Sequence, residues 1–283
     1  MKYYIIIPAY NEEKFISFTL HSILAQTALP EKIVVVNDNS TDKTAQIVQE
    51  FISKNSNISL LNNTSQAIHL PGSKVVLAFQ KGLETLDHDY DFIVKLDADL
   101  ILPANYFKAI IQHFQSDVKI GMAGGFAYIE KNGNWILENL TDKDHIRGAF
   151  KAYKKECFQE IGGLKPAMGW DTVDELLCKF YGWKVITDAS LIVKHLKPTG
   201  GNYSKTARYK QGEAFYSLGY GFWITAIAAL KLSVLKKKPL LFFDYLTGFW
   251  KSKSLKKPLL VTAEQATFIR KYRISKMISK LGF

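Results

Sequence analysis

Cysteine is nearly absent from this chain of 283 residues, which contains only Cys157 and Cys178. Both lie in segments with helical spacing, and neither belongs to a Cys-x-x-Cys or Cys/His pattern suited to zinc. We therefore expect two buried or half-buried thiols in a protein of the reducing cytosol, without a disulfide framework or a zinc site. The hydrophobic fraction of 47% and the charged fraction of 22% are those of a folded globular protein.

The chain also lacks two patterns that are typical of large enzyme classes. No G-x-G-x-x-G follows the first apolar run, which argues against a dehydrogenase that binds a dinucleotide. No Ser/His/Asp or Cys/His arrangement suggests a covalent nucleophile. We therefore expect neither hydride transfer nor a covalent intermediate.

Long hydrophobic runs are missing as well. The longest, residues 218–230, has 13 residues, whereas about 20 are needed to cross a bilayer. Counting on through Lys231 to Leu235 gives only a marginal span, so we expect an interfacial or buried helix. The short apolar run at the start ends at Pro8 and turns polar at Asn11, which predicts no secretory signal peptide.

Acidic residues are scarce after residue 200. That part has 16 lysines and arginines against Glu213, Asp244 and Glu264, a net charge of +13, whereas residues 1–200 carry a net charge of −2. The same part is rich in aromatic residues beside lysine runs, a combination that favours an anionic membrane surface over nucleic acid.

This change in composition predicts a boundary near residue 204. We expect a catalytic domain over residues 1–204 and a basic, aromatic helical region over residues 205–283. Residues 267–283 have the spacing of an amphipathic helix. The region is expected to attach peripherally to the inner, cytoplasmic face of the cell membrane, although its helices could instead simply pack on the domain with solvated lysines.

Strand and helix patterns alternate through the first hundred residues. Apolar runs predict strands at residues 3–7, 33–36, 58–61 and 92–96, and helical spacing predicts helices at residues 12–26, 40–53 and 74–86. This alternation is typical of an α/β fold, with a mostly parallel, Rossmann-like sheet flanked by helices. Further along, we expect helices at residues 150–160 and 172–181 and a strand at residues 191–193.

Three polar clusters follow the predicted strands, at residues 8–12, 37–42 and 97–99. Each alone could be turn chemistry, because Asn, Asp, Ser and Pro are the usual turn residues. A parallel sheet binds its ligand beyond the carboxyl ends of its strands. The three clusters together therefore predict one crevice.

Asp97 and Asp99 directly follow the strand at residues 92–96. Two carboxylates at a strand end suit Mg²⁺ or Mn²⁺ held jointly with substrate phosphates, and a turn or capping role is the alternative. His195 follows another strand and precedes a Gly-rich turn at residues 198–201, where it could approach phosphate or be an ordinary structural histidine.

Asp171 is predicted at a loop-to-helix junction, where a carboxylate can point into a cleft. A general base must lie within hydrogen-bond reach of the hydroxyl that it deprotonates, and this position allows that. Asp174 and Glu175 are expected in the first turn of the same helix, where acidic residues also simply complement the helix dipole.

Four segments resemble, in order and spacing, the family 2 glycosyltransferases. They are residues 6–13 (IIPAYNEE), residues 35–42 (VVNDNSTD), the pair Asp97/Asp99 and residues 169–175 (GWDTVDE), and the similarity extends over about residues 1–200. The resemblance implies a GT-A fold and a metal-dependent, inverting transfer of a sugar from a nucleotide-sugar, with a UDP-sugar favoured, to a hydroxyl acceptor. It further suggests a role in cell-surface glycan or glycolipid assembly, where the acceptor can be lipid-linked.

The resemblance also implies roles for individual residues. The nucleotide-sugar would be bound by Pro8, Ala9, Tyr10, Glu12, Asp38, Asp97, Ala98 and Trp170. The metal would be bound by Asp97, Asp99 and His195, and Asp171 would be the catalytic base.

Two departures from the family pattern stand out. Many members carry an Arg-Asn pair in the helix after the third strand, where this chain has Phe79 and Gln80, so we expect Gly72 and Lys74 to line the nucleotide pocket instead. Trp170 stands where an acidic neighbour of the base is usual.

Two other functions compete with glycosyl transfer. A nucleotidyltransferase also uses paired acids and a metal, but it would usually carry a Gly-rich basic loop near its start, and residues 8–13 are neither. A membrane-associated nucleotide-sugar-binding protein without catalysis would not need Asp97, Asp99 and Asp171 together.

Overall fold

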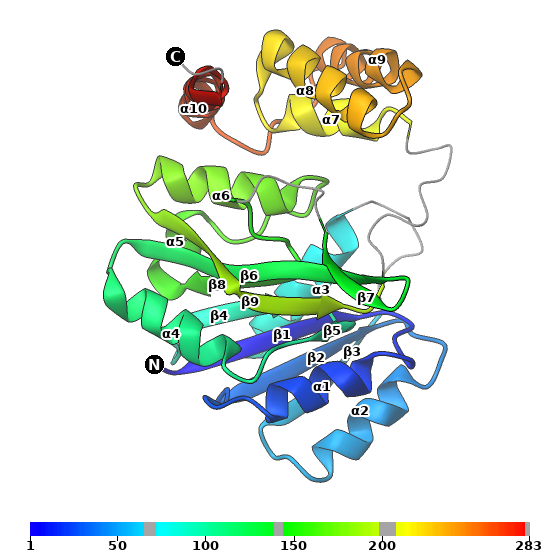
Figure 1. Cartoon of the computed structure of the whole chain (residues 1–283), viewed down its shortest axis with the longest axis vertical. Coiled ribbons are helices and arrows are strands. Elements are labelled where there is room, and N and C mark those ends of the chain that lie inside the picture. The colour runs from blue at the N-terminus through cyan, green and yellow to red at the C-terminus, as the bar shows by residue number, and fades with distance from the viewer. Residues whose placement is uncertain (65–71, 139–143, 198–207, 281–283) are drawn as a thin grey trace. The chain divides into compact units, whose positions relative to one another are not determined.

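The computed structural model describes residues 1–64, 72–138, 144–197 and 208–280, and it divides into two compact units (Figure 1). The first unit contains residues 1–166 and 170–199, and the second contains residues 167–169 and 200–283. The predicted boundary near residue 204 falls outside the described residues.

The first unit is built on a sheet of nine strands, described in the order β3-β2-β1-β4-β8-β6-β9-β5 with β7 paired to β6. β1 to β4 are all parallel, and β8 runs antiparallel to both β4 and β6. The four predicted strands of the first hundred residues are confirmed. The strands are β1 (Tyr3–Ala9), β2 (Lys32–Asp38), β3 (Ile58–Asn63), β4 (Phe92–Leu96), β5 (Leu100–Ile101), β6 (Ile120–Lys131), β7 (Asn134–Leu137), β8 (Phe150–Lys154) and β9 (Lys184–His195).

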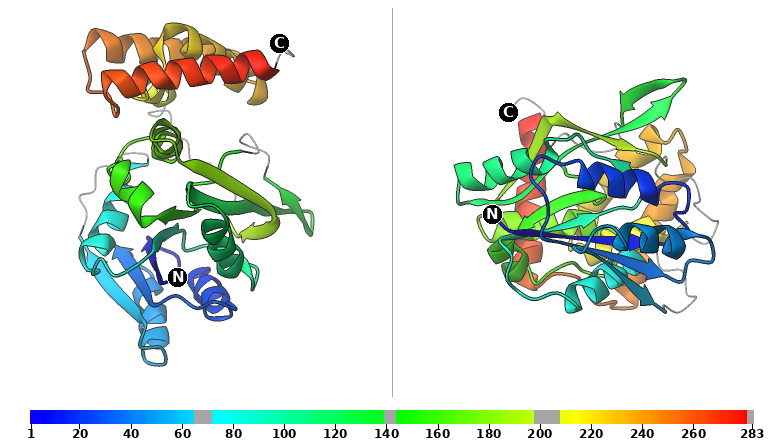
Figure 2. Two further views of the ribbon diagram at one scale, coloured as in Figure 1. Left: turned by 90° about the vertical axis from the view of Figure 1, so that its left-hand side faces the viewer. Right: turned by 90° about the horizontal axis from the view of Figure 1, so that it is seen from below.

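Helices cover both faces of this sheet. Figure 2 shows α1 and α2 on the opposite side of β1 and β2 from α3. Ile5, Ile6 and Ile7 are all 0% exposed, as expected for a parallel strand that is covered on both faces. The helices of this unit are α1 (Ile16–Leu24), α2 (Thr44–Ile52), α3 (Ser73–Glu84), α4 (Tyr106–Ser116), α5 (Lys155–Glu160) and α6 (Trp170–Phe180).

The predicted helix over residues 150–160 is wrong in its first half. Residues 150–154 form β8, which pairs with β4 from Phe92 opposite Lys154 to Leu96 opposite Phe150. The ladder of hydrogen bonds and the burial on both faces outweigh the local helical spacing. Only α5 remains helical in this segment.

The two cysteines lie on α5 and α6, as expected for buried thiols. Cys157 and Cys178 are both free and buried, with their Sγ atoms 3.6 Å apart.

The second unit is helical, as predicted. It contains α7 (Lys210–Ser217), α8 (Gly221–Leu235), α9 (Leu240–Ser254) and α10 (Ala263–Lys280). Within the described ranges, none of the helices combines the length and the apolar character that crossing a bilayer requires. The predicted helix at residues 218–230 lies largely within α8.

A fully buried lysine of β8 holds α6 on the sheet. Nζ of Lys151 lies 2.9 Å from Oδ1 of Asp174 and 3.0 Å from Oε1 of Glu175, and it also donates to the carbonyl oxygen of Asp171. The hydroxyl of Tyr153 donates to Oδ2 of Asp174 at 2.6 Å. Because α6 begins at Trp170, Asp174 and Glu175 lie beyond its first turn, not in it as predicted. They bind the sheet rather than simply complementing the helix dipole.

Lys151→Met should reduce the free energy of unfolding by about 3 to 5 kcal/mol, because it leaves the buried carboxylate of Asp174 without its cation and removes one of the two cations beside Glu175. Urea denaturation of the full chain measures this. Lys154→Met is a matched control on the same strand, because Lys154 is only partly buried, and it should change stability by less than about 1 kcal/mol. Equal stability of both variants would contradict the role assigned to Lys151.

Candidate functional site

The loops that follow β1 and β2 are joined by hydrogen bonds. The amide of Glu12 donates to Oγ1 of Thr44 at 2.7 Å, and the amide of Thr41 donates to Oδ1 of Asn11 at 2.8 Å. Asn11 and Asn39 have φ angles of 54° and 63°, a left-handed conformation that asparagine tolerates better than most residues. The first two predicted polar clusters therefore form one continuous rim.

The residues predicted to bind the nucleotide lie along this rim. Pro8 is half-buried and Ala9 is buried at the end of β1, whereas the next residue, Tyr10, exposes 59% of its surface. Asp38 is buried at the end of β2, and Nδ2 of Asn63 donates to its Oδ1 at 2.7 Å. The ring of Tyr10 is thus open to a ligand, while the carboxylate of Asp38 is oriented from the neighbouring strand.

Glu12 connects the rim to the third polar cluster. Its carboxylate forms an ion pair with Lys197, two residues beyond the end of β9. Burial raises the pKa of Glu12 to about 7, with Lys197 opposing the rise and the negative charges of Asp99 and Asp97 adding to it. The first polar cluster therefore lies within electrostatic reach of the third.

The acidic pair lies in the turn between β4 and β5. Residues 97–99 form this turn, with Ala98 buried. His195, the last residue of β9, pairs with Leu100 of β5, which brings its ring beside the turn. Ligand atoms from three side chains lie within 4.8 Å of one another, and these are Asp97, Asp99 and His195.

His195 is held in its charged form by the surrounding carboxylates. Burial disfavours the charged ring, but Asp99 and Glu138 outweigh that effect and raise the pKa of His195 to about 9. Nε2 lies 3.5 Å from Oδ2 of Asp99, and Nδ1 lies 3.8 Å from Oε2 of Glu138. Once the ring has lost its proton, the cluster offers two carboxylates and one imidazole nitrogen, which suit a divalent cation such as Mg²⁺ or Mn²⁺.

Asp171 lies in the first turn of α6, because that helix begins at Trp170, two residues earlier than predicted. Its side chain is 34% exposed, and Oδ2 lies 3.7 Å from Nε2 of His145. Burial would raise the pKa of Asp171, but His145, Lys151 and Arg147 outweigh burial and lower it to about 2. Asp171 is therefore a partly exposed, ionised carboxylate, whereas the neighbouring Asp174 and Glu175 are enclosed.

Lys95 links the acidic pair to α6. It is only 2% exposed, its ammonium group contacts Oδ1 of Asp97, and it lies 5.3 Å from the centre of the Trp170 ring. The ring also packs closely on Gly148, where a Cβ atom would lie 2.7 Å from it. Trp170, predicted to contact the nucleotide-sugar, is consequently just 7% exposed.

Gly72 and Lys74 lie at the start of α3, Gly72 with a φ of 77°. The two residues that replace the family's Arg-Asn pair have structural roles in this chain. Phe79 is 0% exposed, and Nε2 of Gln80 donates to the carbonyl oxygen of Leu164 at 3.0 Å. The Gly-rich turn predicted at residues 198–201 lies outside the described residues.

Sequence reasoning missed several charged residues of the site. Lys95 had a signal, because a single lysine inside the apolar run of residues 92–96 indicates a buried ion pair. Lys197 lies only two residues from His195 and could have been found by that proximity. His145 and Lys151 had no signal, since their partners on α6 are distant in sequence.

Comparison with known proteins is consistent with this arrangement. Residues 4–168 match the family model described as Glycosyl transferase family 2. A poly-beta-1,6-N-acetyl-D-glucosamine synthase of Staphylococcus aureus is 26% identical over 188 residues, which cover 59% of this chain and 41% of the synthase. The chain therefore spans less than half the length of that relative.

Solved glycosyltransferase structures are similar in fold. A mannosyltransferase of Pyrobaculum calidifontis, solved with GDP-Man and Mn²⁺, has a TM-score of 0.60 at 17% identity, covering 98% of this chain and 80% of its own. Residues 1–349 of TarS from S. aureus, solved with UDP-GlcNAc, have a TM-score of 0.58 at 19% identity, covering 81% and 67%. The predicted GT-A fold is thereby confirmed. Because the family model covers more than half of the chain, this protein belongs to glycosyl transferase family 2.

Proposed function

We propose that this protein is an inverting glycosyltransferase that moves a sugar from a nucleoside diphosphate sugar to a hydroxyl group. The convergence of Asp97, Asp99 and His195 within 4.8 Å is the observation that supports this most strongly. Lys95 and Trp170 connect that cluster to the helix that carries Asp171. The cluster of Asp97, Asp99 and His195 suits a metal-bound diphosphate. Asp171 offers a carboxylate that can accept the proton of a hydroxyl group.

The proposed donor is a nucleotide-sugar, with a UDP-sugar favoured. TarS was solved with UDP-GlcNAc and the mannosyltransferase with GDP-Man, which supports this class of donor. Tyr10, Glu12 and Asp38 lie at the carboxyl ends of β1 and β2, the edge at which α/β sheets bind nucleotides.

Asp97, Asp99 and His195 would hold a Mn²⁺ or Mg²⁺ ion together with the donor phosphates. His195 would first lose its proton, since only the neutral ring is a ligand. Bound there, such an ion supplies positive charge that stabilises the departing diphosphate.

Asp171 would accept the proton of the acceptor hydroxyl as that oxygen attacks the anomeric carbon from the face opposite the nucleotide. The bond between the anomeric carbon and the diphosphate oxygen breaks, and its electron pair leaves with the nucleoside diphosphate. This single displacement inverts the anomeric centre. The low pKa of Asp171 keeps its carboxylate unprotonated before the acceptor binds.

The proposed acceptor is a membrane-proximal hydroxyl, lipid-linked in the simplest case, at the inner face of the cell membrane. The net charge of +13 after residue 200 supports contact with anionic lipid. The S. aureus relative is named as a polysaccharide synthase, which supports a role in cell-surface glycan or glycolipid assembly.

A thermal-shift screen of nucleotide-sugars, with and without Mn²⁺, tests the proposed donor directly. A true donor should raise the melting temperature in the presence of Mn²⁺, because a ligand that binds only the folded chain stabilises it. If no nucleotide-sugar or nucleoside diphosphate changes the melting temperature in either condition, the donor assignment is wrong.

Asp99→Asn should weaken metal-dependent donor binding by about a hundredfold or more, since even loss of an outer-shell group at a metal site costs about tenfold to a hundredfold. Titration calorimetry with donor and Mn²⁺ measures the affinity. Asp89→Asn serves as control, because Asp89 is an exposed carboxylate paired with Lys2. Unchanged affinity of the Asp99 variant would contradict the assignment of Asp99 as a metal ligand.

Asp171→Asn should keep donor affinity while lowering the transfer rate by about a hundredfold or more, the scale of a lost general base. Steady-state transfer to a hydroxyl acceptor, combined with a donor-binding measurement, separates the two effects. This also distinguishes an enzyme from a binding protein without catalysis. A rate within a few-fold of the parent would show that Asp171 is not the base.

A further inference from the structure

Helix α8 buries three small side chains on one side and exposes a row of large apolar ones on another. Thr225, Ala229 and Ser233 are at most 2% exposed. Four residues that recur every three or four positions, and so share one side of the helix, are 52% to 77% exposed: Trp223, Ile227, Leu230 and Val234. A helix that faces water has the opposite arrangement. This side of α8 is therefore suited to an apolar environment.

Helix α9 repeats this arrangement. Its inner side packs against α7 so closely that a Cβ atom on Gly248 would lie 2.2 Å from the carbonyl oxygen of Tyr209, and one on Gly212 would lie 1.8 Å from that of Tyr245. The inner side of α9 also carries Tyr245 and Phe249, which are only 4% and 3% exposed. The large apolar side chains that α9 exposes are Leu240 at 70%, Phe243 at 65% and Trp250 at 48%.

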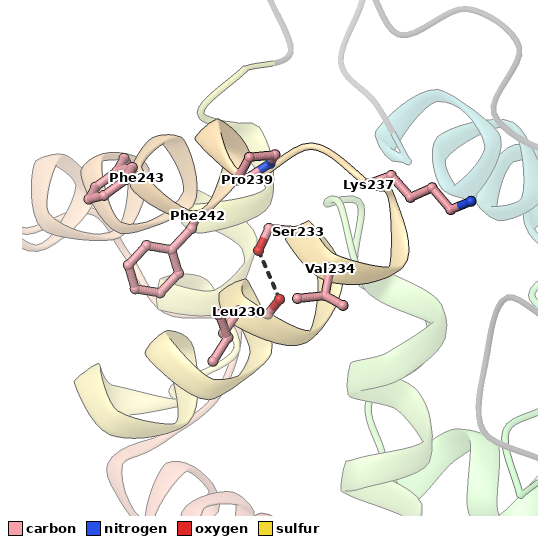
Figure 3. Close-up of a pocket in the computed structure, with 7 residues that line it drawn as sticks. All are labelled: Leu230, Ser233, Val234, Lys237, Pro239, Phe242 and Phe243. Atoms are coloured by element: carbon pink, nitrogen blue, oxygen red, sulfur yellow. Dashed lines mark hydrogen bonds between the residues drawn. The ribbon is translucent and has the colours of Figure 1, made fainter.

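The two exposed rows belong to one surface. At one end, Leu230 and Val234 of α8 and Phe242 and Phe243 of α9 line an open groove of about 460 Å³ (Figure 3). At the other end, the ring of Phe222 lies 5.5 Å from that of Trp250. We call this surface the α8–α9 face, and it consists of Trp223, Ile227, Leu230, Val234, Leu240, Phe243 and Trp250.

The segment that carries the α8–α9 face is rich in positive charge, and Lys237 lines its groove. Residues 221–254 contain six lysines and a single acidic residue, Asp244. Asp244 is buried and forms an ion pair with Arg208 at 2.7 Å, so it does not offset the lysines at the surface. Nζ of Lys253 lies 4.8 Å from the centre of the Trp250 ring. Tryptophan and lysine at the edge of an apolar surface are typical of the boundary between lipid headgroups and acyl chains.

We propose that the α8–α9 face inserts into the acyl boundary of an anionic lipid bilayer, with its lysines at the headgroups and its groove occupied by an acyl chain. This deepens the membrane contact made in the proposed function and rests on it. A second copy of the chain is the competing occupant, but two such faces would bring their lysine clusters together, and like charges repel. An anionic bilayer supplies both the hydrocarbon and the opposite charge.

The α8–α9 face is not the segment for which the sequence pattern predicts membrane contact. Residues 267–283 have amphipathic spacing, and α10 does expose Ile274 at 48% and Ile278 at 47%. These two residues provide a matched control, because they are also apolar, exposed and in the second unit.

Flotation of the full-length protein with vesicles tests the proposal. The vesicles are phosphatidylcholine alone or phosphatidylcholine with about one third phosphatidylglycerol. The double variant Trp223→Ser/Phe243→Ser should lose about tenfold or more in partition to the anionic vesicles, since one buried aromatic side chain alone is worth about tenfold. Ile274→Ser/Ile278→Ser should stay within about twofold of the parent. Brominated acyl chains should quench the fluorescence of the parent, and Trp223→Phe should remove part of that quenching.

Each other outcome overturns the proposal in a distinguishable way. If the parent floats and the Trp223/Phe243 variant floats equally, the membrane contact remains but the face is wrong. If the parent floats with neither vesicle, the membrane part of the proposed function fails together with the face, while donor binding and transfer are judged by their own assays. If the parent is instead a dimer that the face variant converts to monomers, a second copy occupies the face.

Discussion

Two buried lysines that face each other across β4 and β8 determine how the site is assembled. Lys95 and Lys151 are direct partners in the antiparallel pairing, and they are 2% and 0% exposed. A buried ammonium group is stable only beside anions. Lys95 therefore requires Asp97 at the end of β4, and Lys151 requires Asp174 and Glu175 on α6. Because each lysine needs its own anions, the acidic turn is held at the end of β4, and the helix that carries Asp171 is held against the neighbouring strand β8.

The sequence predicts the parts of the site that are local. Buried strands followed by polar turns indicate β1, β2 and β4 and the polar clusters at their ends, because apolar runs and turn residues are signals within a few positions. The strand β8 is missed, because its conformation depends on pairing with β4, which lies more than fifty residues earlier in the chain. His145 is missed for the same reason, since Nδ1 lies 3.1 Å from Oε2 of Glu175 on another element. Long-range partners of this kind have no signal in local spacing.

The second unit shows a different limit of sequence reasoning. Periodicity favours residues 267–283 as the surface helix, whereas α8 is apolar on nearly every side, so its pattern does not predict which side is buried. Which side of each helix is buried depends on the packing of small residues on the inside of α8 and on the close approach of α7 and α9 at Gly212 and Gly248. A row of large apolar side chains on each helix, including Trp223 and Phe243, is left exposed, and its position beside lysines is what suggests a lipid surface.

These features combine into one account, in which a donor and its metal bind at the acidic turn while α6 presents a carboxylate to the acceptor. The most direct measurement is a crystal structure with a nucleoside diphosphate sugar and Mn²⁺, with the metal located by its anomalous scattering. The account predicts a metal peak within about 2 to 2.5 Å of side-chain atoms of Asp99 and His195 and of a donor phosphate oxygen. A donor bound with its diphosphate away from Asp97, Asp99 and His195, or a metal peak outside that cluster, would contradict it.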